Sequence, residues 1–297
     1  MNLQDTFALG SLSIRRLGFG TMQLTGPGVW GEPSDRQSAL TVLRRAETIG
    51  VDFFDTADSY GPHVAEDLLR EALYPYSETL TIATKAGFMR TGPSQWEVNG
   101  HPDYLRRQCE GSLTRLGLER IDLFQLHRVD PRVAEEDQFG LLKTLRDEGK
   151  VLEVGLSEIN VAQIEAARNI VPIVSVQNRY NLADRGADDV VEYCARHQIA
   201  FIPWFPLASG VLSLSKGVVA QVARDLSSTP SQLSLAWLLR RSPVMVPIPG
   251  TSSLAHLEEN CAATDIAMSD TQFEALTSMH GVNRAARRGR VSRSRER

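Results

Sequence analysis

Eight short apolar segments are spread along the chain, and each is followed by a segment whose apolar residues recur at helical spacing. We interpret the eight as strands, which end near Gly20, Asp55, Lys85, His127, Ser157, Gln177, Trp204 and Pro249. Eight alternating strand and helix units over about 250 residues have the size of a closed parallel barrel with its helices outside. The sequence therefore predicts an α/β fold, a (β/α)8 TIM barrel.

The helices of these units are predicted from apolar periodicity and capping patterns. They cover residues 34–49, 65–73, 102–116, 138–148, 161–168, 188–197, 230–241 and 253–261, and a long loop is expected over 86–101. An open doubly wound sheet is the competing architecture, but it would require a GxGxxG turn after the first strand. Residues 18–23, GFGTMQ, lack the third glycine, so the barrel is favoured.

Two further elements are predicted outside the eight units. Residues 6–9 and 12–14 flank a Gly-Ser turn and are expected to form a β-hairpin that plugs or decorates one end of the barrel, and residues 269–280 are expected to form an extra C-terminal helix. No linker rich in Pro, Gly or Ser divides the chain, so residues 1–283 are interpreted as one domain. Residues 284–297 contain seven arginines and one glutamate and are interpreted as a disordered tail.

Composition argues against several classes of protein. The net charge is −4 at pH 7, which gives no reason to expect nucleic acid or an acidic membrane as a partner. The cysteines, Cys109, Cys194 and Cys261, are far apart and odd in number, which is typical of reduced thiols in a cytoplasmic protein. The sequence shows no secretion signal, no apolar stretch long enough to span a membrane, and no CxxC motif or HxH pair that would indicate a metal site.

Four chemically distinct side chains are predicted to meet at one edge of the sheet. Asp55, Lys85 and His127 each end a predicted strand, and Tyr60 follows shortly after Asp55. A lysine beside a tyrosine stabilises the phenolate and makes the tyrosine a better acid, while an aspartate balances the buried ammonium. A histidine can donate a hydrogen bond to a carbonyl oxygen. The group is suited to protonating an oxygen that gains negative charge, as when hydride reaches a carbonyl carbon.

The three segments that carry these residues resemble the catalytic segments of the aldo-keto reductase family, in the same order. They read DTADSYG, TIATKAG and DLFQLHRVD, and the resemblance extends over residues 17–260. Its details are most similar to the bacterial pyridoxal reductase branch. The resemblance implies a nicotinamide cofactor across the mouth of the barrel, NADPH in preference to NADH, and catalysis by Asp55, Tyr60, Lys85 and His127.

The resemblance also implies which residues contact the cofactor. At the nicotinamide end these are Gly20, Thr21, Met22, Asp55, Ser157, Glu158, Gln177 and Trp204; along the pyrophosphate they are Phe205, Pro206, Leu207, Ser209 and Gly210; at the adenosine end they are Pro249, Gly250, Thr251, Ser252, Ser253, His256, Glu259 and Asn260. Either Ser252 or Ser253 can cap the helix that begins there, which would leave backbone amides free for a phosphate.

The cofactor segments depart from the family pattern at several positions. Trp204 stands where many members have tyrosine, and Glu158 stands where asparagine is common. The basic residues that many NADPH-using members carry are represented by Gly250 and His256, so the charge complement to a 2'-phosphate is weak.

The substrate wall is predicted from residues near the four reactive side chains. Trp30, Phe88 and Arg128 join Tyr60 and His127 as candidates, while Trp96 can equally be a loop anchor. The expected reaction is NADPH-dependent reduction of a small aldehyde or ketone, with pyridoxal as the first-guess substrate and a keto sugar or other secondary-metabolite ketone as the alternative.

Two other classes of function stay open from the sequence. One is an NADPH-binding regulatory subunit with slow turnover, and the other is a lyase that uses Lys85 as a Schiff-base nucleophile. A monomer or a homo-oligomer is expected.

Overall fold

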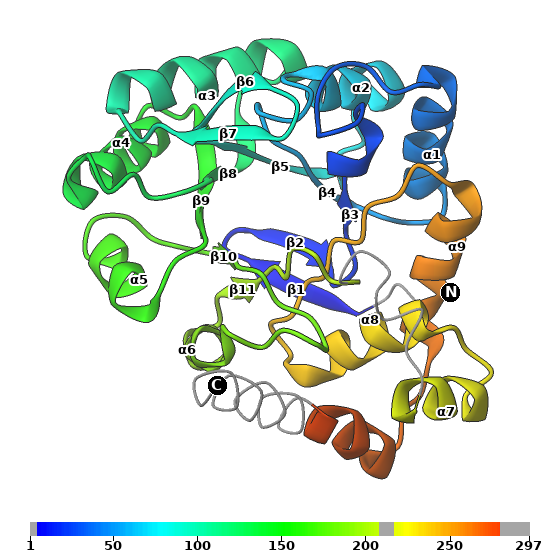
Figure 1. Ribbon diagram of the computed structural model, residues 1–297. Coiled ribbons are helices and arrows are strands. Elements are labelled where there is room, and N and C mark those ends of the chain that lie inside the picture. Colours follow the sequence, from blue (N-terminus) through cyan, green and yellow to red (C-terminus); the bar gives the residue numbers. More distant parts are fainter. Residues whose placement is uncertain (1–4, 208–216, 280–297) are drawn as a thin grey trace, which may run out of the picture.

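Seven parallel strands form one curled sheet, which Figure 1 shows at the centre of the molecule. The structure is a computed structural model that describes residues 5–207 and 217–279. The strands are β3 (Phe19–Gly20), β4 (Phe53–Asp55), β5 (Thr81–Ala86), β8 (Ile121–Leu126), β9 (Val151–Ser157), β10 (Ser175–Gln177) and β11 (Ala200–Phe201). Their order in the sheet follows their order in the chain, so each connection is a crossover to the next neighbour.

The segment 244–248 closes this sheet into a barrel, although only one residue of it makes a strand-like bridge. Met245 pairs in parallel with Phe201 of β11, and the Gly18 amide donates to the Pro247 carbonyl oxygen at 3.0 Å. The eighth strand was predicted over 244–248, and the structure has a single bridge there instead of a strand. Pro247 and Pro249 have no amide proton to donate, so a regular ladder cannot continue through them. The predicted (β/α)8 barrel is nevertheless confirmed.

Two glycines allow the closing segment to approach the first strand. A Cβ atom on Gly250 would lie 2.4 Å from the Gly20 carbonyl oxygen, and one on Gly20 would lie 2.8 Å from the Ile248 carbonyl oxygen. Both glycines were assigned to cofactor contact from the sequence, but the close backbone packing is a sufficient reason for glycine at each position.

Helices surround the sheet in Figure 1, and most of their bounds agree with the sequence prediction. They are α1 (Arg36–Thr48), α2 (Val64–Leu73), α3 (Pro102–Leu116), α4 (Glu135–Asp147), α5 (Val161–Arg168), α6 (Asp188–His197), α7 (Val218–Asp225), α8 (Pro230–Arg241) and α9 (Leu254–Ala262). Residues 270–279 form the expected additional helix. The predicted bounds of α3, α5, α6 and α8 are confirmed. Helix α1 begins at Arg36 and not at residue 34 as predicted, because the Asp35 side chain caps it by accepting the Ser38 amide at 2.9 Å.

Two elements were missed by the sequence analysis. The expected loop over 86–101 contains the antiparallel strands β6 (Phe88–Gly92) and β7 (Gln95–Val98), and α7 was not predicted. The hairpin has an irregular register between Met89 and Gly92, so its side chains lack the strict alternation that indicates a strand. Helix α7 lacks a side-chain cap, because Gly217 precedes it, whereas α5, which has the same length, begins with a capping box of Asn160 and Gln163.

The N-terminal hairpin closes the end of the barrel opposite to the strand carboxyl ends. It consists of β1 (Thr6–Leu9) and β2 (Leu12–Arg15), which pair in antiparallel fashion as predicted. The Ser11 amide and hydroxyl both donate to Glu153 Oε1 at 2.7 Å, and the Arg15 amide donates to Asp52, which precedes β4. The carboxyl ends of the strands therefore remain open for a site.

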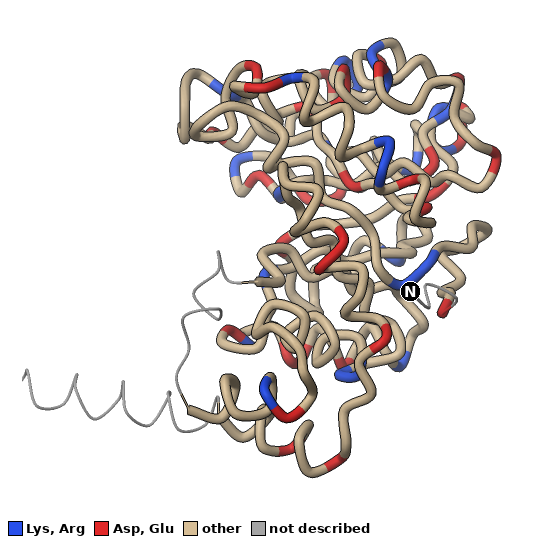
Figure 2. The backbone as a smooth tube through the Cα atoms, turned by 90° about the vertical axis from the view of Figure 1, so that its right-hand side faces the viewer, with Lys and Arg blue, Asp and Glu red and all other residues tan. Residues whose placement is uncertain are grey.

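Basic and acidic residues are interspersed over the side of the molecule shown in Figure 2. All three cysteines are buried and free. No helix within residues 5–207 and 217–279 has the length and apolar character needed to cross a membrane.

Candidate active site

The centre of the candidate site is a buried ion pair at the carboxyl ends of β4 and β5. Lys85 Nζ donates to Asp55 Oδ1 at 2.6 Å and to the Thr56 carbonyl oxygen at 2.7 Å, and the Lys85 side chain is completely buried. Burial alone would lower the pKa of the Lys85 ammonium, but the Asp55 charge and the hydrogen bond to it leave this pKa above its ordinary value. Lys85 is therefore a fixed positive charge beneath the site.

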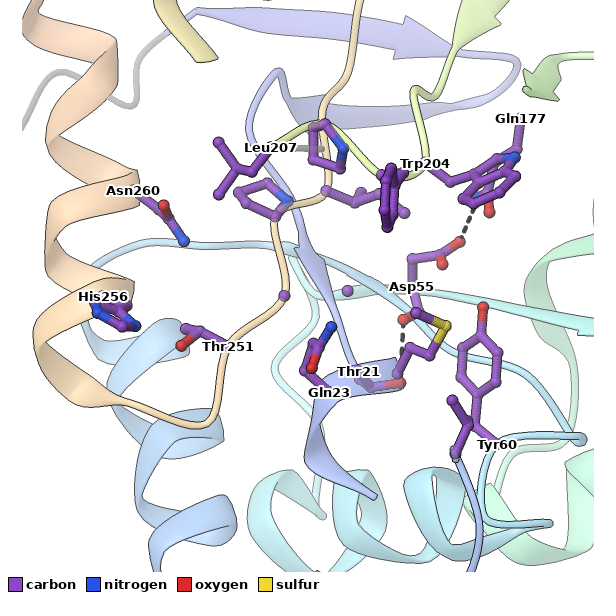
Figure 3. A pocket seen from close by; sticks show the side chains of 18 of the residues that line it. Thr21, Gln23, Asp55, Tyr60, Gln177, Trp204, Leu207, Thr251, His256 and Asn260 are labelled. Carbon is purple, nitrogen blue, oxygen red and sulfur yellow. Dashed lines mark hydrogen bonds between the residues drawn. The ribbon is translucent and has the colours of Figure 1, made fainter. Parts of the chain in front are cut away.

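Two glutamines hold the second oxygen of Asp55. Gln177 Nε2 donates to Asp55 Oδ2 at 2.8 Å, a contact drawn in Figure 3, and Gln125 Nε2 donates to the same oxygen at 3.2 Å. Gln125 was not assigned a role from the sequence. The available signal was its place two residues before His127, because alternate residues of a strand face the same side. Asp55 thus has partners for both oxygens and is held rigidly.

Tyr60 lies next to this ion pair, on the loop that follows β4. Lys85 Nζ is 5.2 Å from the centroid of the Tyr60 ring, and in Figure 3 the phenol projects into the cavity toward Asp55 and Trp204. Burial raises the pKa of the Tyr60 phenol, Lys85 lowers it and Asp55 raises it, so the balance lies above the ordinary value. The expectation that Lys85 makes Tyr60 a stronger acid was therefore wrong for the net shift, because burial outweighs the contribution of Lys85.

His127 follows β8 and faces Tyr60 across the same space. The two ring centroids are 6.0 Å apart, and the Phe88 ring packs edge-on against the imidazole at 4.7 Å. Burial and the positive charges of Lys85 and Arg128 hold the pKa of His127 well below its ordinary value, so the ring is neutral at pH 7. Its Nδ1 is 3.4 Å from the Ser59 hydroxyl oxygen. When that hydroxyl donates to Nδ1, Nε2 carries the ring proton and can donate it to a substrate oxygen.

The β6–β7 hairpin forms one wall of the site. Phe88 and Trp96 line the cavity and their ring centroids are 5.3 Å apart. The guanidinium of Arg90 lies 3.6 Å from the Trp96 ring centroid and donates to the Ser59 carbonyl oxygen at 2.7 Å. Arg90 thereby joins the hairpin to the loop that carries Tyr60.

Trp30, which was predicted to be a wall residue, lies beside the arginine that holds the hairpin. It is absent from the described lining of the cavity, and its ring centroid lies 5.7 Å from the Arg90 guanidinium. Arg90 also donates to the carbonyl oxygens of Gly28 and Val29 at 2.9 Å. Trp30 therefore packs on the arginine that fixes the hairpin, and its contact with a substrate stays a prediction.

Trp204 and Glu158 form a pair that the sequence did not predict. The Trp204 indole Nε1 donates to Glu158 Oε1 at 2.6 Å, and the Arg179 amide donates to the same oxygen at 2.6 Å. Glu158 has a backbone φ of 54°, which turns the chain immediately after Ser157. Glu158 does not line the cavity itself, but it accepts a hydrogen bond from Trp204, which does.

One elongated cavity of about 1130 Å³ connects these residues with the N-terminal end of α9. Figure 3 shows Tyr60 and Trp204 toward one end and His256 and Asn260 toward the other. Most residues assigned from the sequence line it: Gly20, Thr21, Met22, Asp55, Tyr60, Phe88, His127, Arg128, Ser157, Gln177, Trp204, Phe205, Pro206, Leu207, Pro249, Gly250, Thr251, His256, Glu259 and Asn260. Lys85, Ser252 and Ser253 lie outside its described lining, and Ser209 and Gly210 fall outside the described residues.

The far end of the cavity contains residues that the sequence analysis missed. Thr229, Pro230 and Ser231 line it at the start of α8, and the Thr229 hydroxyl donates to Glu259 Oε1 at 2.5 Å. Ser253 caps α9 by accepting the His256 amide at 3.4 Å, so Ser253 and not Ser252 is the cap of this helix.

Among the described residues, no group of three or more His, Cys, Asp or Glu side chains could hold a metal ion.

The fold and the site define an α/β-barrel oxidoreductase, and comparison with known proteins identifies its family. Residues 16–280 match the aldo/keto reductase family model. The chain belongs to the aldo/keto reductase family and is an NAD(P)H-dependent enzyme that acts on small carbonyl compounds.

Individual relatives are similar over nearly the whole chain. An uncharacterized oxidoreductase of Schizosaccharomyces pombe is 49% identical over 91% of this chain and 88% of its own length. Pyridoxine 4-dehydrogenase of Escherichia coli is 43% identical over 94% of this chain and 99% of its own length. The crystal structure of an aldo/keto reductase from Klebsiella pneumoniae in complex with NADP and acetate has a TM-score of 0.79 at 26% identity, covering 93% of this chain and 95% of that one.

Proposed function

We propose that the protein reduces an aldehyde or ketone with NADPH, that Tyr60 donates the proton, and that pyridoxal is the first candidate substrate. The observation that carries the mechanism is the position of the buried Lys85 ammonium, which lies 2.6 Å from Asp55 and 5.2 Å from the centroid of the Tyr60 ring. The 43% identity to a pyridoxine 4-dehydrogenase supports pyridoxal.

The residues present fit a nicotinamide dinucleotide. The cavity is elongated. Hydrogen-bonding and aromatic side chains line it near Tyr60, and residues at the start of α9 line its other end. Gln177 uses its Nε2 on Asp55, which leaves Oε1 free to accept from a carboxamide. The Ser157 hydroxyl accepts from Arg128 at 3.0 Å and keeps its own proton to donate. Ser157 and Gln177 would hold the carboxamide, with Trp204 stacked on the ring.

The adenosine end supports only a modest preference for NADPH over NADH. Thr251, His256 and Asn260 would surround the ribose and adenine, and His256 is the only basic side chain among the described residues that line this end. Glu259 lies beside it and accepts a hydrogen bond from Thr229. A 2'-phosphate would therefore find hydroxyl and amide donors but little positive charge.

The four central residues would divide the work of protonating the carbonyl oxygen. A bound nicotinamide cofactor would supply the hydride that the carbonyl carbon receives. Neutral His127 donates a hydrogen bond that orients the carbonyl oxygen, and Tyr60 gives its proton to that oxygen as negative charge develops. Lys85 then stabilises the phenolate, and Asp55 compensates the buried ammonium. A raised phenol pKa does not prevent this transfer, because the alkoxide that forms on the substrate is a much stronger base than a phenolate.

The structure also bears on the alternative in which Lys85 acts as a Schiff-base nucleophile. Lys85 is buried, does not line the cavity, and is paired with Asp55, which keeps its amine protonated. A protonated amine has no lone pair for attack on a carbonyl. These observations favour reduction over the lyase mechanism.

A panel of carbonyl compounds tests the proposed function directly. We expect the purified full chain to consume NADPH with pyridoxal and with simple aromatic aldehydes such as 4-formylpyridine, and to consume NADH more slowly. The measurement is the loss of absorbance of the reduced cofactor. A protein that binds NADPH but leaves every carbonyl of the panel unchanged, keto sugars included, would instead be a cofactor-binding regulatory subunit.

The pH dependence distinguishes Tyr60 from His127 as the proton donor. The Tyr60 pKa lies above its ordinary value of about 10 and the Lys85 pKa is also raised, so both groups keep their protons through the neutral range. The His127 pKa lies well below 6.5, so the ring is neutral there. We therefore expect kcat/KM for carbonyl reduction to be nearly constant between about pH 7 and 9, and oxidation of the alcohol, which needs the phenolate, to accelerate as pH rises.

The measurement is kcat/KM in both directions at constant ionic strength, with cofactor binding determined at each pH as the control. A reduction rate that falls tenfold per unit between pH 6 and 8 would indicate a donor that titrates near neutrality, as protonated histidine does, and would contradict the assignment to Tyr60.

A further inference from the structure

We propose that Arg128 forms a binding site for an anionic oxygen of the substrate, so that the protein prefers aldehydes and ketones that carry a carboxylate, phenolate or phosphate close to the carbonyl group. The proposal rests on the proposed carbonyl reductase function and adds the class of substrate. It is carried by the position, partners and surroundings of one arginine.

Arg128 lies in the part of the cavity where the carbonyl would react. It follows His127 directly in the chain and lines the same cavity as Tyr60 and His127. Its guanidinium carbon is 5.3 Å from the Phe88 ring centroid and 6.0 Å from the Trp204 ring centroid, so the cation stands between the hairpin wall and the predicted nicotinamide platform. A substrate that packs against Phe88 would therefore lie close to the positive charge of Arg128.

Two of the three guanidinium nitrogens of Arg128 donate no hydrogen bond to a described residue. Nη1 donates to the His127 carbonyl oxygen at 2.5 Å and to the Ser157 hydroxyl at 3.0 Å. Nε and Nη2 have no hydrogen-bond partner among residues 5–207 and 217–279. A guanidinium carries five N–H donors in a planar fork, which is suited to two oxygens of one anionic group.

No carboxylate neutralises Arg128 within ion-pair distance in the described structure. Glu158 acts on it electrostatically but does not come within 4.0 Å, and its Oε1 already accepts from Trp204 and from the Arg179 amide. Lys85, the completely buried cation next to Tyr60, is balanced by Asp55. A half-buried positive charge without an ion-pair partner is costly, and a substrate anion would remove that cost.

The remaining charges of the cavity do not oppose an anion at this position. Asp55 is paired with Lys85, and His127 is neutral at pH 7. Glu259, the other acidic side chain of the lining, lies with His256 on α9 at the opposite end. The substrate end thus has a local excess of positive charge. Pyridoxal fits the inferred class, because its ring carries an ionisable oxygen on the carbon next to the aldehyde.

The test compares two aldehydes that differ in charge and little in shape, 3-formylbenzoate and its methyl ester. For the native protein we expect a higher kcat/KM with the carboxylate. Arg128→Gln should lower that kcat/KM by about 10- to 100-fold more than the value for the ester, which corresponds to one charge-assisted hydrogen-bonded contact. Both substrates share the loss of the hydrogen bond from Arg128 to Ser157, so this loss cancels in the ratio. Arg128→Lys should lie between the native protein and Arg128→Gln, because it keeps the charge and loses the fork.

Arg179→Gln is the matched control. Arg179 also lies over the Trp204 ring, at 5.9 Å from its centroid, but it is already paired with Asp184 at 3.0 Å and does not line the cavity. We expect this variant to leave the ratio of the two substrates unchanged. A native protein that prefers the ester, or an equal loss of both substrates in Arg128→Gln together with weaker NADPH binding, would overturn the anion site. The second result would mean that Arg128 acts only by orienting Ser157.

A binding measurement separates this proposal from the proposed function. The alcohol 3-(hydroxymethyl)benzoate and its methyl ester can be titrated in the presence of NADP+, with tryptophan fluorescence as the readout, because Trp96 and Trp204 line the cavity. Tighter binding of the carboxylate that is lost in Arg128→Gln supports the anion site even if no aldehyde is turned over. Turnover of the ester without any preference for the carboxylate in rate or binding supports the reductase and rejects the anion site.

Discussion

Replacing Tyr60 with phenylalanine is expected to reduce kcat/KM for carbonyl reduction by about 10²- to 10⁴-fold, while the affinity for NADPH stays within about twofold. The substitution removes the phenol hydroxyl that lies beside the Lys85 ammonium and faces His127 in the cavity. The ring remains, so its edge-on packing against His127 is preserved. Lys85 keeps its hydrogen bonds to Asp55 and Thr56, and no buried charge loses its counter-charge. The expected loss therefore comes from the proton-donation step and not from unfolding.

Single-turnover rates and NADPH titrations of the same samples measure the two effects separately. Tyr76→Phe is the matched control, because the Tyr76 hydroxyl donates to the Leu116 carbonyl oxygen at 2.7 Å and does not line the cavity. That variant should lose some stability and keep its turnover. If Tyr60→Phe retained more than a tenth of the native rate, the proton would have to come from another group or from water.

The positions of the four central residues could be predicted because strand ends are local features with a shared destination. Asp55, Lys85 and His127 each follow an apolar run, and a parallel barrel brings all strand carboxyl ends to one face. The same reasoning predicted that Ser157 and Gln177 lie at the ends of their strands. This reasoning could not predict the direction in which each polar atom points. The bond from Gln177 to Asp55 and the one from Trp204 to Glu158 depend on neighbouring strands and loops packed together.

The net effect on the Tyr60 pKa could not be predicted for a related reason. Proximity of Lys85 was correctly expected to lower it, but the magnitude of burial depends on what covers the ring. The cover includes Met22 and Val29, which pack against the cluster that contains Tyr60 and come from the segment that follows β3. The packing of Trp30 on Arg90 is likewise a long-range contact that no spacing rule indicates.

Replacing Lys85 with methionine is expected to be the most damaging single change to both activity and stability. The ammonium is completely buried and holds Asp55 Oδ1 at 2.6 Å. Its removal leaves a buried carboxylate without a counter-charge, which typically costs about 3–5 kcal/mol in the free energy of unfolding. The phenolate of Tyr60 also loses the charge that stabilises it. We therefore expect turnover to fall by at least as much as in Tyr60→Phe, together with a lower midpoint of chemical denaturation.

The double variant Asp55→Asn/Lys85→Met separates the two consequences. Removing both charges abolishes the uncompensated carboxylate, while the amide oxygen introduced by Asp55→Asn can still accept from Gln125 and Gln177. Stability should then recover by about 1–3 kcal/mol relative to Lys85→Met alone, whereas activity should not recover, because the phenolate still lacks its cation. Lys85→Arg keeps the charge in a bulkier group and should retain more stability than Lys85→Met. A double variant no more stable than Lys85→Met would show that Asp55 is not held by charge compensation. A double variant with native activity would show that the ammonium does not act on Tyr60, and the proposed mechanism would have to be abandoned.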